Sequence, residues 1–300
     1  MLDLAAVPAS TLNLEAYFNR IDYTGPRAPT LDVLRNIVFQ HTTHIPFENL
    51  SVLQGRGVSL DPLHVHRKLV TERRGGYCFE QNTLLLHVLT TLGFAITPLS
   101  ARVRLQLQRD ITPPRTHLFN RVTIDGTPWL ADAGVGGFSP TAPLRLDTSE
   151  PQTTTHNTHR IVHEDGRFFH QALLKDESSS ANDGARDGVN NSAGNKGSWS
   201  DVYEFTGEPM PLIDRTIANW WTSTSPESKF NKSLMAALAH ADGTRVGVMN
   251  RTFTRRRDSD VIESRDIASP GELLTILHHE FGLSFDAGTR FGQPGSDWPS

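Results

Sequence analysis

The spacing of apolar residues divides this chain into a helical first third and a strand-rich middle. In the first third, apolar residues recur at intervals of three and four, the spacing of helices that bury one face. The pattern predicts helices over four segments: Leu12–Ile21, Leu31–Phe39, Pro62–Val70 and Cys78–Leu92. Gly-Pro and glycine-rich turns separate these segments.

After the fourth helix, the period changes from that of helices to that of strands. Alternating polarity with β-branched and aromatic residues predicts strands over Ala101–Leu107, His117–Ile124 and Gly166–His170. Asp125-Gly126 and Asp165-Gly166 are dipeptides typical of tight hairpin turns. The middle of the chain is therefore predicted to form an antiparallel sheet or a small barrel.

The last third mixes short helices and strands and ends in a helix with clear termini. Ser269 is suited to cap its start, Pro270 to occupy its first position, and Glu272 to complete a capping box. Gly282 stands where a helix commonly ends in a left-handed residue.

A polar segment at about residues 176–200 stands between the strand-rich middle and the last third. It is rich in Ser, Asn, Asp and Gly and has too few apolar residues to contribute to a core. We expect it to be a flexible surface insertion.

Length, charge and cysteine count exclude several classes of protein. A chain of 300 residues buries a substantial core in two or three domains. The net charge of −4 gives no reason to expect nucleic acid as a partner. No stretch approaches the roughly 20 apolar residues that span a bilayer, so no membrane association is expected. A single cysteine and no recognisable secretory signal predict a reducing, cytoplasmic location.

The single cysteine, Cys78, lies where a glycine-rich turn becomes a strongly apolar helix. The first helical turn exposes unpaired N–H groups and the positive end of the helix dipole, which favours a thiolate there. A buried structural cysteine is the ordinary alternative. Gly75 and Gly76 permit a tight turn just before the helix and favour the interpretation as a nucleophile.

A cysteine nucleophile needs a base and, usually, a third group that orients the base. Of the thirteen histidines, His117 is best placed, because it opens a predicted strand. Asp132 follows an apolar strand end, where a buried carboxylate needs a partner such as an imidazole N–H. A polar residue at a strand end and an aspartate that starts a turn are the ordinary alternatives for these two residues.

Several short motifs together resemble the arylamine N-acetyltransferase family. Those around the candidate nucleophile, base and acid stand in the order and spacing of that family: Ile45–Leu50 (IPFENL), Arg74–Glu80 (RGGYCFE), Thr116-His117 and Asp132–Gly134 (DAG). The resemblance continues through Asn219–Phe230 and the segment that begins at Ser269. It covers nearly the whole chain except the insertion.

The resemblance implies an α+β fold in three parts. An N-terminal helical bundle over residues 1–94 would carry the cysteine, and a central antiparallel β-barrel over residues 95–205 would carry the histidine and the aspartate. A C-terminal α/β lid would occupy residues 206–300.

The resemblance also implies roles for particular residues. Cys78, His117 and Asp132 match a catalytic triad related in geometry to that of papain-like proteases. Glu48 and Arg74 match a charged pair that ties the cysteine loop to the preceding helix, which is a structural role.

The implied reaction transfers an acetyl group from acetyl-CoA to an aromatic amine or hydrazine, by a ping-pong mechanism through an acetyl-cysteine thioester. Phe47 and Phe230 match the walls of an apolar pocket that restrains water. Gly134, Gly136 and Gly137 would let the backbone approach the pyrophosphate arm of the coenzyme. No metal is expected.

One departure from the family concerns the acceptor. The family commonly has Phe where this chain has Val135, so we expect a reshaped acceptor pocket and weaker stacking on an aromatic amine. The acceptor range and the preferred acyl group therefore stay open, and so does the choice between xenobiotic acetylation and amide formation on a biosynthetic acyl chain.

Other classes of function also stay open on the residues alone. A cysteine hydrolase could use the same triad and release free acid, and a non-catalytic homologue could simply bind coenzyme A or an aromatic ligand. A metal enzyme is a weaker alternative, because the clustered histidines lack a recognisable site signature. The histidines concerned are His41, His44, His64, His66, His156, His159 and His163.

Overall fold

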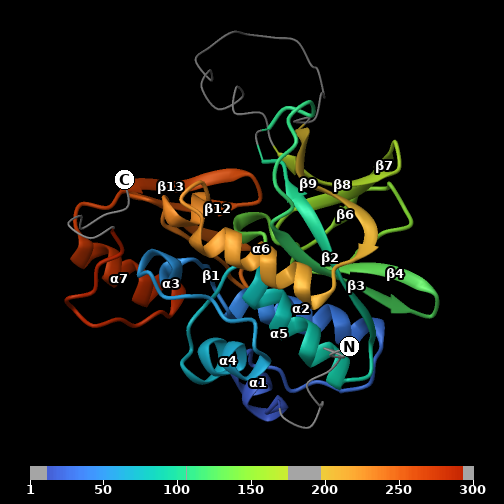
Figure 1. Cartoon of the computed structure of the whole chain (residues 1–300), viewed down its shortest axis with the longest axis horizontal. Helices are drawn as coiled ribbons and strands as arrows, with labels where there is room; N and C mark the ends of the chain where they lie inside the picture. The colour runs from blue at the N-terminus through green and yellow to red at the C-terminus, as the bar shows by residue number, and fades with distance from the viewer. Residues whose placement is uncertain (1–11, 106, 175–196, 293–300) are drawn as a thin grey trace, which may run out of the picture.

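The computed structural model describes residues 12–105, 107–174 and 197–292, which form helices, a large barrel-like sheet and a smaller sheet (Figure 1). The helices are α1 (Leu14–Arg20), α2 (Leu31–His44), α3 (Leu50–Leu53), α4 (Pro62–His66), the π-helix η2 (Arg67–Thr71), α5 (Cys78–Thr91), the 3₁₀ turn η3 (Gly136–Phe138), α6 (Leu212–Thr224), the 3₁₀ turn η5 (Lys229–Asn231) and α7 (Pro270–Phe281). Among the described residues, no helix is both long and apolar enough to cross a membrane.

The strands form two antiparallel sheets. Their bounds are β1 (Phe47–Glu48), β2 (Ala95–Val103), β3 (His117–Ile124), β4 (Thr127–Ala131), β5 (Leu144–Arg145), β6 (Gln152–Thr153), β7 (Thr158–Glu164), β8 (Arg167–Leu174), β9 (Ser198–Pro209), β10 (Met235–Ala239), β11 (Thr244–Met249), β12 (Thr252–Arg257) and β13 (Asp260–Asp266). The larger sheet has the order β5-β4-β3-β2-β9-β8-β7-β6 and curls into a nearly closed barrel, with β5 beside β7. The smaller sheet has the order β1-β10-β11-β12-β13.

Both predicted hairpins are present. Asp125 and Gly126 have φ of 50° and 77°, and Asp165 and Gly166 have φ of 49° and 73°. Two successive residues in the left-handed region match the right-handed twist of the strands that they join. The first turn connects β3 to β4, and therefore fixes the register of the strand that starts at His117.

The terminal helix α7 is capped almost as predicted. The Ser269 hydroxyl accepts the N–H of Glu272 at 3.2 Å, Pro270 is its first residue, and Gly282 ends it with φ 65°. The Glu272 carboxylate accepts the N–H of Ala268 at 2.7 Å, one residue earlier than a standard capping box requires.

Several sequence-based boundaries were wrong: the helix predicted over Leu31–Phe39 continues to His44, and the strand predicted over Gly166–His170 continues to Leu174. The strand predicted over Ala101–Leu107 lies over Ala95–Val103 instead, because the chain leaves the sheet where the buried Arg104 side chain turns inward. The helix predicted over Pro62–Val70 continues as a π-helix to Thr71. The insertion cannot extend to residue 200, since Ser198 already begins β9; residues 176–196 lie outside the described residues.

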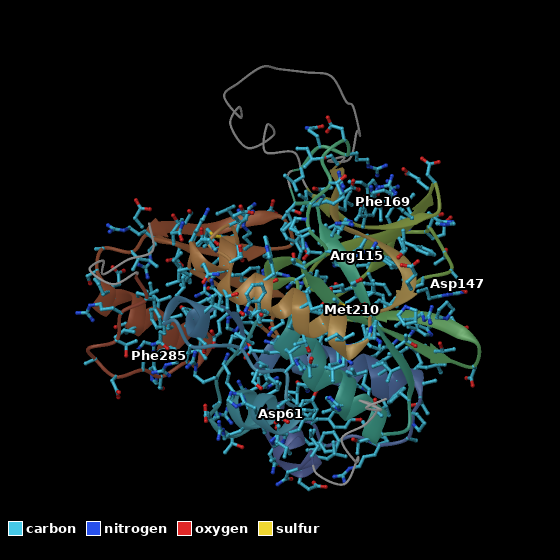
Figure 2. All side chains as sticks on the ribbon, in the orientation of Figure 1. Asp61, Arg115, Asp147, Phe169, Met210 and Phe285 are labelled. Atoms are coloured by element: carbon cyan, nitrogen blue, oxygen red, sulfur yellow. The ribbon has the colours of Figure 1, made fainter. Side chains whose placement is uncertain are left out.

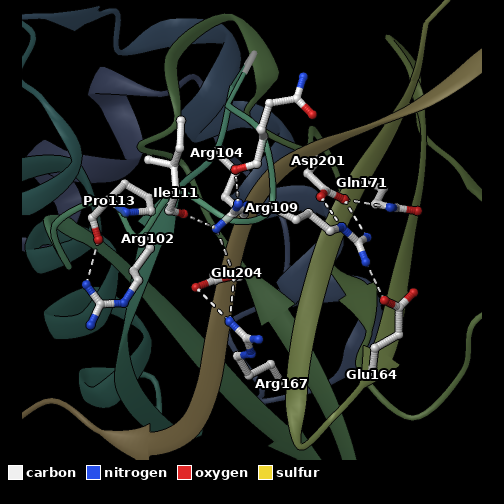
Figure 3. A network of polar contacts seen from close by, with 11 residues as sticks. Arg102, Arg104, Arg109, Ile111, Pro113, Glu164, Arg167, Gln171, Asp201 and Glu204 are labelled. Carbon is white, nitrogen blue, oxygen red and sulfur yellow. Dashed lines mark hydrogen bonds and ion pairs between the residues drawn. The ribbon is translucent and has the colours of Figure 1, made fainter.

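A polar network on the strands β2, β8 and β9 holds the connection that precedes His117 (Figure 3). Arg104 on this connection pairs with Glu204 of β9 at 3.1 Å and also donates to the carbonyl oxygens of Gln108 (2.6 Å) and Ile111 (3.2 Å). Arg102 donates to the carbonyl of Pro113 at 2.6 Å. These bonds fix the path of the chain between β2 and β3.

The proposed parts share elements. Strand β1 follows the helices α1 and α2 in the chain, yet it pairs with β10 of the smaller sheet, Phe47 opposite Ala237. Strand β9 runs to Pro209, past the predicted end of the barrel at residue 205. Strand β1, which belongs to the N-terminal part of the chain, is thus an edge strand of the C-terminal sheet.

Candidate active site

Cys78 is the first residue of α5 and is almost completely buried. Its Sγ lies 3.6 Å from the carbonyl oxygen of Thr116, the residue before His117. A side chain would not fit at either of the two glycines that precede Tyr77. A Cβ on Gly76, for example, would lie 2.7 Å from an oxygen of Glu80. Glu80 in turn accepts the N–H of Tyr77 at 3.2 Å, which fixes the start of the helix.

His117 and Asp132 lie together at the barrel end nearest α5. His117 opens β3, Asp132 follows β4, and the imidazole Nε2 is 2.7 Å from the carboxylate Oδ2. Both side chains are buried. Because Nε2 is hydrogen-bonded to Asp132, Nδ1 is the ring nitrogen available to exchange a proton with Cys78.

The charges of this pair stabilise each other. Burial by itself lowers the pKa of His117, but the charge and hydrogen bond of Asp132, with a further contribution from Cys78, raise it above its ordinary value. Burial raises the pKa of the Asp132 carboxyl, yet His117 and the hydrogen bonds from Asn82 and Gly134 lower it overall. Both shifts favour the charged pair, in which an imidazolium lies beside a carboxylate.

Two residues that complete this arrangement were missed from the sequence. Asn82 lies one helical turn after Cys78 and donates to Asp132 Oδ1 at 2.9 Å and to the Leu118 carbonyl at 2.7 Å. Its i+4 spacing from Cys78 was the available signal. Tyr203 of β9 packs its ring 4.9 Å from that of His117, and nothing in the local sequence marks it.

The loop before Cys78 is tied to β1. Arg74 and the buried Glu48 form the expected ion pair, with Nη2 and Oε1 2.8 Å apart. Backbone bonds join Gly76 to Pro46 at 3.2 Å and Glu48 to Gly76 at 3.1 Å. Glu48 lies in strand β1 instead of the helix that the resemblance suggested.

Aromatic rings surround the nucleophile on one side. The rings of Phe47 and Phe230 lie 6.3 Å apart, and Tyr77 meets Phe230 edge-on at 5.3 Å. All three pack in one apolar cluster with Cys78, which we call the Cys78 cluster. Val135, by contrast, packs in the apolar interior of the barrel, so its role in an acceptor pocket stays a prediction.

The three candidate glycines have different surroundings. A Cβ on Gly134 would lie 2.6 Å from Cys78 Cα, and one on Gly136 would lie 3.5 Å from the Phe47 ring. A Cβ on Gly137 would meet no atom within 4 Å. The absence of a side chain at Gly134 thus lets the turn after Asp132 lie against the nucleophile, whereas Gly136 suits the turn through its left-handed backbone, with φ 66°.

A cleft of about 450 Å³ opens beside Thr116, between the connection before β3 and helix α6. Arg115 and Met210, both labelled near the centre of Figure 2, line it. Met210 also belongs to the Cys78 cluster. The cleft therefore borders the Cys78 cluster.

Six of the seven histidines considered as metal ligands hydrogen-bond to other protein groups, and His163 stacks on the Phe168 ring. His41 lies between Tyr17 (2.9 Å) and Gln81 (2.8 Å), and the His156 Nδ1 lies 3.0 Å from the Thr141 hydroxyl. His159 Nδ1 lies 3.0 Å from His170 Nε2. Over residues 12–105, 107–174 and 197–292, no group of three or more His, Cys, Asp or Glu side chains is arranged to hold a metal ion.

Comparison with known proteins shows the class to which this fold and site belong. A family model described as N-acetyltransferase matches residues 30–290, so the chain is an enzyme of the N-acetyltransferase class. It is 38% identical to the arylamine N-acetyltransferase of Mycobacterium tuberculosis, over 96% of this chain and 99% of that protein. The chain belongs to the arylamine N-acetyltransferase family, as its motifs indicated.

Solved structures agree with this assignment. The arylamine N-acetyltransferase of Mycobacterium marinum superposes with a TM-score of 0.81 at 35% identity, over 94% of this chain and 96% of that chain. The structure of that protein in complex with CoA superposes with a TM-score of 0.80 over the same shares. The mixed α/β fold with its antiparallel barrel is thus confirmed.

Proposed function

We propose that this enzyme acetylates aromatic amines or hydrazines with acetyl-CoA, in a ping-pong reaction through an acetyl thioester on Cys78. The observation that carries the proposal is the position of Cys78, at the N-terminus of α5 and beside the buried His117–Asp132 pair. Family membership and the CoA complex of the M. marinum relative support coenzyme A as the carrier of the acyl group.

In the first half-reaction, the Cys78 thiolate attacks the acetyl carbonyl carbon. Backbone N–H groups at the start of α5 stabilise the oxyanion, because the first helical turn has no internal acceptors for them. The bond to the coenzyme sulfur then breaks. Coenzyme A leaves as a thiol with the proton that His117 held, and Cys78 keeps the acetyl group.

In the second half-reaction, the amine nitrogen attacks the thioester carbonyl. His117, now neutral, takes the amine proton, and the Cys78 thiolate leaves, which restores the starting ion pair. Asp132 holds the imidazole through Nε2 in both steps. The acetylated amine and free coenzyme A are the two products.

Transfer must be faster than hydrolysis of the thioester. Phe47 and Phe230 of the Cys78 cluster would exclude water and pack on an aromatic acceptor. Gly134, Gly136 and Gly137 are the proposed path of the coenzyme arm: Gly134 lets the turn lie close to Cys78, Gly136 lies beside the Phe47 ring, and a Cβ on Gly137 would meet no atom within 4 Å, which leaves its backbone accessible to a ligand. No step of this chemistry requires a metal, and a reducing cytoplasm would keep Cys78 a thiol.

Intact-protein mass after incubation with acetyl-CoA tests the proposal. The wild type should gain one acetyl group and Cys78→Ser none, and an arylamine such as anisidine should remove the adduct as acetylated product. An adduct that survives in Cys78→Ser, or none at all, would contradict the transferase. Release of acetate at a rate that the amine does not change would identify a hydrolase instead.

A further inference from the structure

A further buried ion pair lies at the start of α5, the helix that begins with the nucleophile. Lys68 Nζ, from the π-helix η2, is 2.6 Å from Glu80 Oε1 in the first turn of α5, and their side chains are 10% and 3% exposed. The other oxygen of Glu80 accepts the N–H of Tyr77. One carboxylate thus holds both the lysine and the residue that precedes Cys78.

The charges around this pair are balanced. Glu48 from β1 and Arg74 from the cysteine loop face Lys68, so two anions and two cations lie together. His117 and Asp132 face Cys78 from the barrel, and Tyr77 lies next to both Cys78 and Glu80. Removing one member of the group leaves an excess charge at the start of the helix that begins with Cys78.

The pair depends on its partners for its ionised state. Burial raises the pKa of the Glu80 carboxyl even with Lys68 beside it. Burial lowers the pKa of Lys68, but the charges of Glu80 and Glu48 more than reverse this. A carboxylate at the helix start also interacts with the positive end of the helix dipole. It therefore reduces the stabilisation that the dipole gives to a thiolate at Cys78. Without a cation beside it, Glu80 would oppose that thiolate.

We infer that Lys68 is a positioning residue for the reaction: it neutralises Glu80, which can then fix the Tyr77 N–H without its charge opposing the Cys78 thiolate. The inference rests on the proposed function, in which that thiolate is the nucleophile. It deepens that proposal by adding two residues that touch no reacting atom.

The pH dependence of Cys78 alkylation tests the inference. Cys78 is the only cysteine of the chain, so the rate of iodoacetamide modification reports on it alone. In Lys68→Met, the half-maximal rate should shift upward by up to about one pH unit, because Glu80, where it stays ionised, then carries an uncompensated negative charge in the helical turn that starts at Cys78. In the double variant Lys68→Met with Glu80→Gln, most of that shift should disappear, since Gln still accepts the Tyr77 N–H.

A matched control separates charge from stability. Arg255→Met breaks another ion pair, with Glu280 of α7, and should lower the melting temperature without moving the alkylation profile. Coincident profiles for Glu80→Gln and wild type would overturn the inference, as would a Lys68→Met shift that the double variant keeps in full.

If Lys68→Met does not fold, Glu80→Gln alone is measured. Its profile should shift downward relative to wild type, and an unchanged profile would overturn the inference. The alkylation assay uses no acetyl-CoA. A failed inference is therefore distinguishable from a failed transferase, which would show no acetyl adduct on the wild type.

Discussion

Substitution of Gly134 tests how closely the turn after Asp132 is fitted to the nucleophile. A Cβ at this position would lie 2.5 Å from Asn82 Nδ2, 2.6 Å from Cys78 Cα and 3.0 Å from Cys78 Cβ. Ordinary carbon contacts are about 3.5–4.0 Å, so the turn and α5 must separate by about 1 Å. Gly134 is not in the left-handed region, so the whole effect comes from space.

The expected size of the effect follows from that displacement. Overpacking of a buried site costs about 1–3 kcal/mol of the free energy of unfolding. A shift of about 1 Å between reacting groups lowers a rate by about 100-fold. Gly134→Ala should therefore lose about that factor in the rate of Cys78 acetylation, measured by quenched-flow intact mass, and should unfold at lower urea concentration.

Gly137→Ala is the matched control in the same turn. A Cβ there meets no atom within 4 Å, so its stability should change by less than about 0.5 kcal/mol. If Gly134→Ala acetylates and unfolds like Gly137→Ala, the close approach to Cys78 does not constrain the site and the reasoning is refuted. A raised KM for acetyl-CoA in Gly137→Ala alone would support the proposed path of the coenzyme.

Three further predictions follow from the site and its surroundings. Burial lowers the pKa of His41 to about 4, so the folded state binds fewer protons than the unfolded state between pH 4 and 6.5. The free energy of unfolding should therefore fall by about 3 kcal/mol as the pH drops from 6.5 to 4. A His41→Gln variant, measured by urea denaturation, should lack this part of the loss. In Asp132→Asn, His117 loses the charge that raises its pKa, and the acetylation rate should fall about 10³–10⁴-fold; a loss under tenfold would exclude Asp132 from the triad. Because Val135 packs inside the barrel, Val135→Phe should destabilise the fold by about 1–3 kcal/mol; a changed KM for the arylamine at unchanged stability would instead place this side chain in the acceptor pocket.

Local signals in the sequence predicted many elements well. The start of α5 at Cys78, the whole of β3 from His117 to Ile124, both hairpin turns and the termini of α7 agree with the structure. Each depends on a few neighbouring residues, such as a cap, a glycine or a turn pair, whose backbone preference needs no distant partner. The strand boundary after Val103 was missed because Arg104 is drawn inward by Glu204, one hundred residues further along the chain.

The sequence by itself predicted the candidate nucleophile, base and acid, as one cysteine at a helix start, a histidine that opens a strand and an aspartate that follows one, and its motifs predicted the family. Only the tertiary structure decided how these groups are supported. Asn82 meets Asp132, Tyr203 packs on His117, and Lys68 neutralises Glu80, and each contact joins different elements. The physical reason is that burial makes an unpaired polar group costly, so each one takes the partner that the packing of helices and sheet brings to it, and no local pattern records that partner.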